Sequence, residues 1–209
     1  MITRLKKSYR SIKKHLGEPN VSDWIYDNFY LIDRRYRALI KNKKALFHKR
    51  LSGLIYSCLE DCDFSPSPKK LISCINVEGK GFGYEALASV SDIVCACAII
   101  RIGESLETNI GADMIPNAVK TLNSVADPEY GDIIKSTWAP ERIVSSYEPD
   151  YERFSPETKD RYRKAIADIA RKSGKSEMQT AIDLTEKAKK DGCLVGDLLF
   201  KPDKKYAFL

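Results

Sequence analysis

The stretch that decides the fold is Val21 to Leu39, VSDWIYDNFYLIDRRYRAL. Its apolar residues recur at steps of three and four, which is the spacing of one face of an α-helix: Ile25, Phe29, Ile32, Tyr36, Leu39 and Ile40. Ser22 and Asp23 suit the first turn, where a serine side chain accepts backbone hydrogen bonds and an acid favours the positive end of the dipole. Val21 and Tyr26 have the spacing of a hydrophobic staple over that cap. The pattern predicts a packed amphipathic helix.

The composition of the 209 residues is that of a folded protein with a basic N-terminal quarter. Charged residues make up 31% and hydrophobic residues 43%, which is ordinary for a globular chain. Residues 1–50 hold 14 Lys and Arg against 4 Asp and Glu, a net charge of +10, so residues 51–209 carry −4. A basic segment of this kind suits an acidic partner domain, an anionic membrane surface or nucleic acid, although it is more often a solvated helix face. Part of the excess charge could also be neutralised within the domain by Glu60, Asp61 and Asp63.

No membrane-spanning or secretory segment is predicted. The longest unbroken apolar run is Ile93 to Ile100, far short of the roughly 20 residues that cross a bilayer. Residues 1–16 lack the apolar region of a signal peptide. The cysteines lie in apolar helical patterns and are predicted to be reduced, small buried residues: Cys58, Cys62, Cys74, Cys95, Cys97 and Cys193. We therefore expect the chain in the cytoplasm or at the cytosolic face of a membrane.

The apolar pattern predicts an all-α fold, an irregular bundle of about eight to ten helices. The domains are predicted as a basic helix (1–20), a helical domain (21–200) and a tail (201–209), and the KNKK segment at 41–44 is left open between a turn and continuous helix. Tyr84 to Leu106 is the most apolar helix and is expected to be central and buried on most sides. The other helices are expected at 45–59, 69–77, 117–125, 130–138, 140–146, 156–173 and 176–190, with loops at 17–21, 62–68, 78–83, 107–116, 147–155 and 172–176. Pro68 could be the first residue of the second of these helices, and Ser155 with Pro156 is expected to start the helix at 156–173. Gly174 is expected to end that helix, and Ser176-x-x-Gln179 is a capping box that opens the next. The predicted core is Trp24, Phe29, Ile32, Leu54, Leu87, Val94, Ala98, Ile102, Ile166 and Ile169.

Three ordered segments resemble the N-terminal region of cyclic β-1,2-glucan synthases, a family of large membrane glycosyltransferases. Trp24 to Ile32, WIYDNFYLI, is similar to the family's W-x-x-D-N-F/Y-x-h helix. Gly83 to Glu104 resembles the helix from G-E-L-W-A-L-P to L-R-h-x-x-x-E-N, without the family's Trp and Pro. Phe154 to Glu177 resembles M-D-F-x-T-R-D-x-Y-R-x-x-I followed by I-A-R-R-S-G-x-S-E. The stretch from Ala118 and the segment Leu194 to Phe200 also follow the family, with Leu194 at a family histidine.

The resemblance implies a helical accessory module that precedes the membrane-spanning and transferase parts of such an enzyme. The parent activity would be glucosyl transfer from a nucleotide sugar into β-1,2-glucan. The implied partner is a downstream transferase domain of the same or a neighbouring polypeptide. We expect no catalytic, cofactor-binding or metal-binding residue in this chain.

Four local patterns that resemble active-site chemistry are interpreted as structural. Asp61-Cys62-Asp63 is a D-x-D, but it ends a helix instead of a strand of a nucleotide-binding sheet. Cys58, Cys62 and Cys74 supply too few ligands for a structural zinc. His15 and His48 lie in basic helices with no dyad partner. The glycine loop at 79–83 fits no phosphate-binding spacing and would need a strand over 71–77.

The alternative function is a stand-alone helical binding module that uses its basic N-terminal face for nucleic acid or an anionic partner, and of these nucleic acid is the less favoured. The basic residues of the first 44 positions are interleaved with Tyr9 and Tyr36, which would supply charge for phosphates and rings for stacking. No recognition motif accompanies them. The helical pattern already explains both tyrosines as core or boundary residues.

Overall fold

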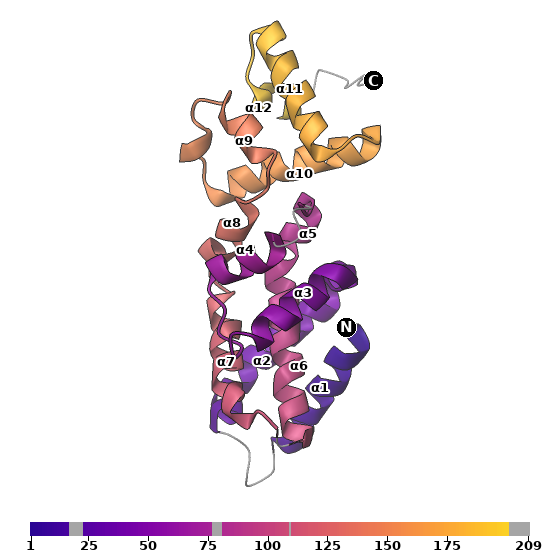
Figure 1. The fold of residues 1–209 in the computed structure, drawn as a ribbon, viewed down its shortest axis with the longest axis vertical. Helices are drawn as coiled ribbons and strands as arrows, with labels where there is room; N and C mark the ends of the chain where they lie inside the picture. Colours follow the sequence, from indigo (N-terminus) through magenta and orange to yellow (C-terminus); the bar gives the residue numbers. More distant parts are fainter. Residues whose placement is uncertain (17–22, 77–80, 109, 201–209) are drawn as a thin grey trace. The chain divides into compact units, whose positions relative to one another are not determined.

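The computed structural model describes residues 1–16, 23–76, 81–108 and 110–200. Twelve α-helices and three short 3-10 helices are present in these ranges, which contain no strand, so the predicted all-α fold is confirmed (Figure 1). The count exceeds eight to ten because the stretch expected as one helix over 84–106 forms two helices, of which α5 (Tyr84–Ala88) is the first, and because α12 (Val195–Phe200) was not among the expected helices. The helix expected at 140–146 is α9 (Glu141–Ser145). No helix in the described ranges is both long and apolar enough to cross a membrane.

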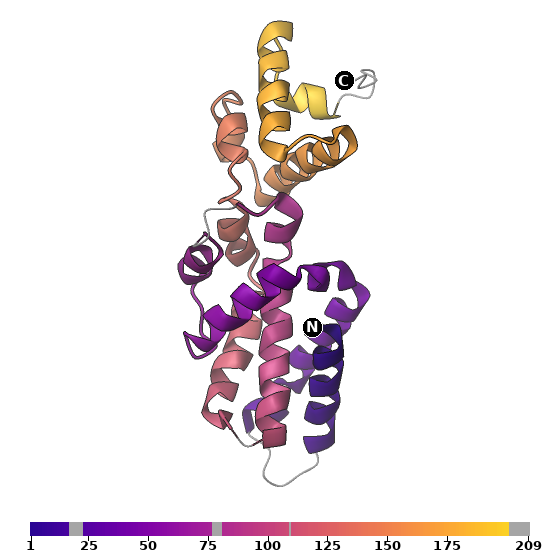
Figure 2. The ribbon, with the colours of Figure 1, turned by 45° about the vertical axis from the view of Figure 1, so that its right-hand side comes forward.

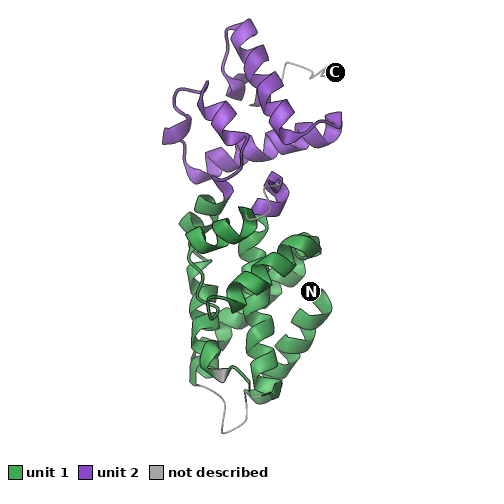
Figure 3. Ribbon diagram, in the orientation of Figure 1, with its two compact units in different colours: residues 1–80, 88–134 green, residues 81–87, 135–209 purple. Residues whose placement is uncertain are grey.

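The chain divides into two compact units, each described here by itself (Figure 3). Unit 1 comprises residues 1–80 and 88–134, and unit 2 comprises residues 81–87 and 135–209. The boundary expected after residue 20, the Val21–Ser22 cap and the tail 201–209 lie outside the described residues. The three-part division expected from the sequence stays a prediction.

Unit 1 is built around α6 (Val90–Thr108), which is surrounded by α1 (Ile2–His15), α3 (Lys49–Glu60) and α7 (Ile115–Ser124) in two views (Figures 1 and 2). α2 (Asp23–Lys41) packs on both α6 and α7. Because apolar residues cover the whole circumference of α6, twelve of its nineteen residues are buried. The prediction of a central helix buried on most sides is confirmed.

The prediction of one continuous helix from Tyr84 to Leu106 is wrong. α5 ends at Ala88, Ser89 forms a turn, and α6 begins at Val90. The Ser89 carbonyl accepts the first hydrogen bond of α6, from the amide of Ile93 at 3.0 Å. Serine suits such a position because it favours helix starts over helix interiors. The break also lies close to the change from unit 2 to unit 1, between residues 87 and 88.

Other predicted helices of unit 1 are found close to their expected places. α4 (Pro68–Asn76) starts at the predicted proline and packs on α3. The open question at 41–44 is resolved as a break, because α2 ends at Lys41 and a 3-10 helix, η1 (Lys43–Phe47), follows. α7 and α8 (Pro128–Lys135) account for the helices expected at 117–125 and 130–138.

The predicted common core is wrong in two respects. Trp24 is 41% exposed, with the ammonium of Lys120 lying 5.2 Å from its ring centre. It precedes Ile25 by one residue, so it lies about 100° around the helix from the buried stripe. Phe29, Leu54 and Ile169 are half-buried. Leu87, Ile166 and Ile169 belong to unit 2, whereas the remaining members belong to unit 1.

Unit 2 consists mainly of α9, α10 (Pro156–Ser173), α11 (Glu177–Asp191) and α12. Helices α10 and α11 begin at residues that the sequence predicted as caps. The Ser155 hydroxyl accepts from the amide of Thr158, with Pro156 at the first helical position. Gly174 ends α10 in the left-handed conformation, at φ 70°. The Ser176 hydroxyl accepts from the amide of Gln179 and caps α11. The predicted starts of α10 and α11 and the predicted end of α10 are confirmed, whereas the Gln179 side chain of the predicted capping box donates to Asp183 at 2.8 Å.

Candidate binding surface

The D-x-D motif lies where the sequence placed it, in the turn that follows α3. Asp61 is the C-terminal cap of that helix and Asp63 has a positive φ of 49°. In the described part of the chain, no three or more His, Cys, Asp or Glu residues lie close enough together to hold a metal ion. The motif is therefore part of a helix end, and no nucleotide-binding sheet accompanies it.

The cysteines are free thiols, as the sequence predicted. Cys58, Cys95 and Cys97 are buried and the other three are half-buried. Burial raises the pKa of the Cys58 thiol to about 12, and the neighbouring Cys74 thiol contributes to the shift. Burial likewise raises the pKa of Cys95 and Cys97 to about 12. Neutral, desolvated thiols of this kind are poor nucleophiles.

The glycine-rich loop leads into a site that the chain fills with its own carboxylate. The segment before the loop is helix α4 instead of a strand, which removes the phosphate-binding interpretation. The Tyr84 amide at the start of α5 donates to Glu177 Oε2 at 3.0 Å. Trp138 Nε1 donates to the same oxygen at 2.5 Å. Glu177 therefore occupies the position at which an anion would meet these donors.

Unit 2 also contains buried charges that the sequence analysis did not single out. The Arg163 guanidinium is fully buried and forms a two-point pair with Glu141, with N–O distances of 2.8 and 2.9 Å. Asp160 accepts a further hydrogen bond from Arg163 at 2.9 Å. Glu148 accepts from the Tyr162 hydroxyl and from the Val195 amide. Because each carboxylate already has partners, this network is suited to holding helices together.

The basic N-terminal quarter forms a surface on α1 and α2, and this is the candidate site. α1 carries six Lys or Arg residues and no acid, and all six are exposed: Arg4, Lys6, Lys7, Arg10, Lys13 and Lys14. α2 presents a solvent face at steps of four and three, formed by Tyr26, Tyr30, Arg34, Arg37 and Lys41. We call these two sets together the α1–α2 surface.

The α1–α2 surface exposes aromatic rings next to cations. Tyr26 is 70% exposed and Tyr30 is 75% exposed. The Arg34 guanidinium lies 5.9 Å from the centre of the Tyr30 ring. The helical pattern did not indicate this feature, because the spacing of Tyr26 suits a staple over the helix cap and Tyr30 lies outside the apolar stripe. Asp23 precedes Tyr26 and Asp27 lies between Tyr26 and Tyr30, so the negative charge lies at the N-terminal end of α2 and the positive charge gathers towards its C-terminal half.

Part of the basic charge is neutralised inside unit 1. Arg4 pairs with Glu104 of α6 at 2.9 Å, and Lys7 pairs with Glu107 at 2.8 Å. Glu60, Asp61 and Asp63, which the sequence offered as the neutralising groups, form no ion pair within the described residues. Several cations likewise have no ion pair with any described residue: Lys6, Arg10, Lys13, Lys14, Lys41, Lys43 and Lys44. A positive field therefore remains at this surface.

Tyr9 fixes α1 against α2. Its ring stacks on Tyr36 with 3.7 Å between ring centres, and its hydroxyl donates to Asp33. Asp33 also accepts from Arg37 at 2.8 Å. Burial and then the bond to Asp33 raise the pKa of Tyr9 to about 12, while the bond from Tyr9 and the Arg37 guanidinium lower the pKa of Asp33. Tyr9 and Tyr36 thus pack against each other, and the prediction that both are core or boundary residues is confirmed, since Tyr9 is buried and Tyr36 is half-buried.

His15, the last residue of α1, and His48 are the two histidines of the chain. His15 Nδ1 lies 2.8 Å from the Ser11 carbonyl oxygen, one turn earlier in α1. His48 immediately precedes α3.

Comparison of the chain with models of known families, with curated proteins and with solved structures finds no match. The resemblance to cyclic β-1,2-glucan synthases therefore stays a prediction.

Proposed function

We propose that this chain is a non-catalytic helical module that binds an acidic protein domain through the α1–α2 surface. The proposal rests on two features of this surface. α1 carries exposed cations that have no ion pair with any described residue, and α2 exposes Tyr26, Tyr30 and Arg34. Tyrosine and arginine are the residue types that contribute most to binding energy at protein interfaces. The cations favour an acidic partner and speed its approach.

A protein partner is favoured over nucleic acid and over a membrane. The rings that would have stacked on bases, Tyr9 and Tyr36, are packed against each other. A helix that lies on a membrane needs a broad apolar face towards the lipid. The apolar face of α1 is used against α6 instead, since Leu5 and Ile12 are fully buried.

The three ordered landmarks support a synthase-like enzyme as the parent. Two of them meet inside unit 2. Tyr84 of the second landmark donates to Glu177 of the third, and Glu85 pairs with Arg171 at 2.6 Å. The partner in this proposal is the downstream transferase domain of the same or a neighbouring polypeptide, and glucosyl transfer would take place there. Incubation of the isolated chain with UDP-glucose tests the non-catalytic role, because any glucan formed would refute it.

The binding experiment mixes the chain with the transferase domain encoded downstream and measures affinity by calorimetry. Lys6→Glu with Arg10→Glu should weaken binding at least tenfold, since two favourable charges become repulsive. Tyr26→Ala with Tyr30→Ala should weaken it similarly. The control, Lys172→Glu with Lys190→Glu, makes the same charge change on exposed residues of unit 2 and should leave affinity unchanged.

Two results would contradict the proposal. The first is equal weakening by the α1 pair and by the control pair, which would indicate a non-specific effect of net charge. The second is tighter binding to phosphatidylserine-containing vesicles than to the domain, with neutral vesicles as reference. That result would assign the α1–α2 surface to a membrane.

A further inference from the structure

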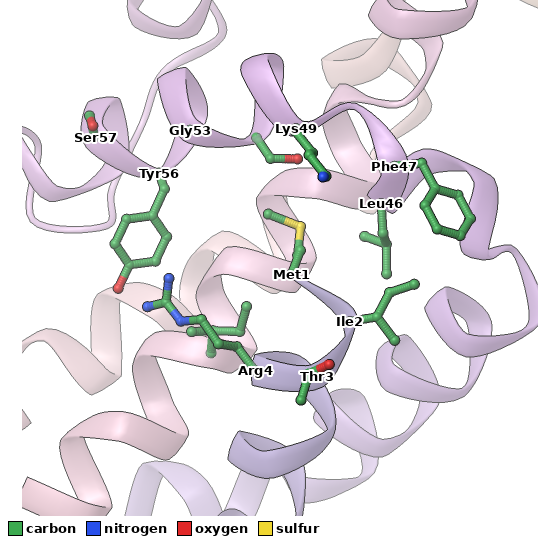
Figure 4. A pocket seen from close by; sticks show the side chains of 12 residues that line it. Met1, Ile2, Thr3, Arg4, Leu46, Phe47, Lys49, Gly53, Tyr56 and Ser57 are labelled. Atoms are coloured by element: carbon green, nitrogen blue, oxygen red, sulfur yellow. The ribbon is translucent and has the colours of Figure 1, made fainter.

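Unit 1 contains a cavity of about 610 Å³ between the first turn of α1, η1 and α3 (Figure 4). Its volume lies within the range of roughly 300–1,000 Å³ that small-molecule sites occupy. The lining is largely apolar, with side chains from Met1, Ile2, Leu46 and Ile100. Leu46 and Ile100 are 3% and 1% exposed, so this wall belongs to the packed core of unit 1.

One polar group in the cavity wall has no partner. The Ser52 hydroxyl is buried, and no hydrogen-bond partner lies within reach of it among the described residues. A buried hydroxyl without a partner is unfavourable and calls for a partner such as a water, an ion or a ligand group. Ser52 lies three residues after Lys49, and this spacing places both on one side of α3.

The cavity offers one uncommitted side-chain cation. Arg4 also lines it, but its guanidinium is held by Glu104 in two hydrogen bonds of 3.0 and 3.1 Å and lies 4.9 Å from the Tyr56 ring centre. Lys49 is exposed and forms no ion pair with any described residue. The side chains therefore provide one positive charge and one hydroxyl beside an apolar chamber.

We propose that this cavity binds the monocarboxylate form of a medium-chain fatty acid. The carboxylate accepts hydrogen bonds from Lys49 Nζ and the Ser52 hydroxyl, and the alkyl chain lies against Ile2, Leu46 and Ile100. Lys49, the lining side chain whose positive charge has no ion pair among the described residues, matches the single charge of a monocarboxylate. Of the described residues of the α1–α2 surface, Arg4 alone lines the cavity, and its guanidinium is held by Glu104.

The probes are decanoate and, as a neutral partner of equal chain length, decanol, measured by calorimetry on the full chain. Decanoate should bind more tightly than decanol. Lys49→Gln should weaken decanoate about tenfold, the loss expected for one charge-assisted hydrogen bond, and leave decanol unchanged. Lys69→Gln, on an exposed residue outside the cavity wall, is the matched control.

Two further variants separate binding from folding. Gly53 lines the cavity, and a Cβ added there meets nothing within 4 Å, so Gly53→Leu should fill the space without a clash and abolish binding of both probes. Ser52→Ala should weaken decanoate yet raise the melting temperature, because it removes an unpartnered buried hydroxyl.

Unchanged decanoate binding in Gly53→Leu, or equal affinity for decanoate and decanol, would overturn the proposal. Decanoate binding lost with Lys6→Glu and Arg10→Glu would also overturn it, because the ligand would then lie on the α1–α2 surface. Phosphatidylcholine vesicles test the other source of acyl chains, a membrane lipid instead of a free fatty acid. Uptake from vesicles with no binding of free decanoate would contradict the assignment to a free fatty acid.

Discussion

The two units of this chain are stabilised by different kinds of core. The core of unit 1 lies around its helix α6, whose buried side chains between Ile93 and Ile102 are aliphatic or thiol groups. Unit 2 instead encloses Arg163, which is fully buried against Glu141 and Asp160. Trp138, 2% exposed, is tied by its ring nitrogen to Glu177.

The difference teaches where each unit is vulnerable. An apolar core loses stability when a charge or an extra atom enters it, because nothing nearby can solvate the charge or yield space. A core that contains paired charges loses stability when one partner is removed, because the other charge is left buried. The four predictions that follow test this contrast, from the largest expected effect to the smallest.

Val94→Asp should abolish the folding of unit 1. Val94 is fully buried in the middle of α6, and an unpaired carboxylate there should cost more than about 4 kcal/mol. Far-UV circular dichroism during thermal unfolding measures the effect, with Val94→Ala as the control for lost volume alone. Melting of Val94→Asp like that of the unchanged chain would show that the side of α6 assigned to the core faces water.

Arg163→Met should destabilise unit 2 by about 3–5 kcal/mol, because Glu141 loses its buried partner. Adding Glu141→Met should recover most of the loss, since an apolar pair no longer carries an unpaired charge. Trp138 fluorescence in a Trp24→Phe background reports on unit 2 during urea unfolding. Lys164→Met, on an exposed neighbouring residue, is the control, and a loss equal to that of Arg163→Met would contradict the prediction.

Two glycines test close packing in the two units. A Cβ on Gly103 would lie 2.5 Å from the Ser8 backbone, so Gly103→Ala must push α1 from α6 and should cost about 2–3 kcal/mol. A Cβ on Gly196 would meet the Tyr162 hydroxyl, a side-chain end that can move, so Gly196→Ala should cost only about 1–2 kcal/mol. Gly53→Ala, in open space, should stabilise by about 0.5–1 kcal/mol. Urea unfolding measures the three changes in free energy. A larger loss for Gly196→Ala than for Gly103→Ala would contradict the prediction.

Both units contain a tyrosine that donates to a carboxylate, and alkaline pH should weaken both. Burial, followed by the bond to Asp33, raises the pKa of Tyr9 to about 12. Its stabilising effect is therefore complete below about pH 10, the ordinary tyrosine pKa, and is lost as the pH rises towards 12. Burial, and then the charge of Glu148, likewise raise the pKa of Tyr162.

Tyr9→Phe should therefore flatten the fall in unfolding free energy between pH 10 and 12. Tyr162→Phe should do the same for the part of the transition that Trp138 reports. An exposed tyrosine provides the control, and Tyr30→Phe should leave the slope unchanged. Equal slopes for all three variants would show that neither buried hydroxyl couples protonation to folding.

The helices and their ends could be predicted because their causes are local. Ser155 and Pro156 start α10, Gly174 ends it, and Ser176 starts α11, each through contacts within a few residues. The apolar circumference of α6 likewise predicted a central helix. The break at Ser89 was missed because the apolar pattern continues across it. α5 ends at Ala88, next to the boundary between unit 2 and unit 1 at residues 87 and 88.

The sequence by itself determined the all-α fold, the caps, the buried position of α6 and the concentration of positive charge in the first 50 residues. Only the tertiary structure decided which partners those residues have. It paired Arg4 and Lys7 with α6, left the tyrosines of α2 exposed, and divided the predicted single core between two units. The physical reason is range: helix periodicity and capping act over a few residues, whereas ion pairs such as Arg4 with Glu104 join positions 100 residues apart.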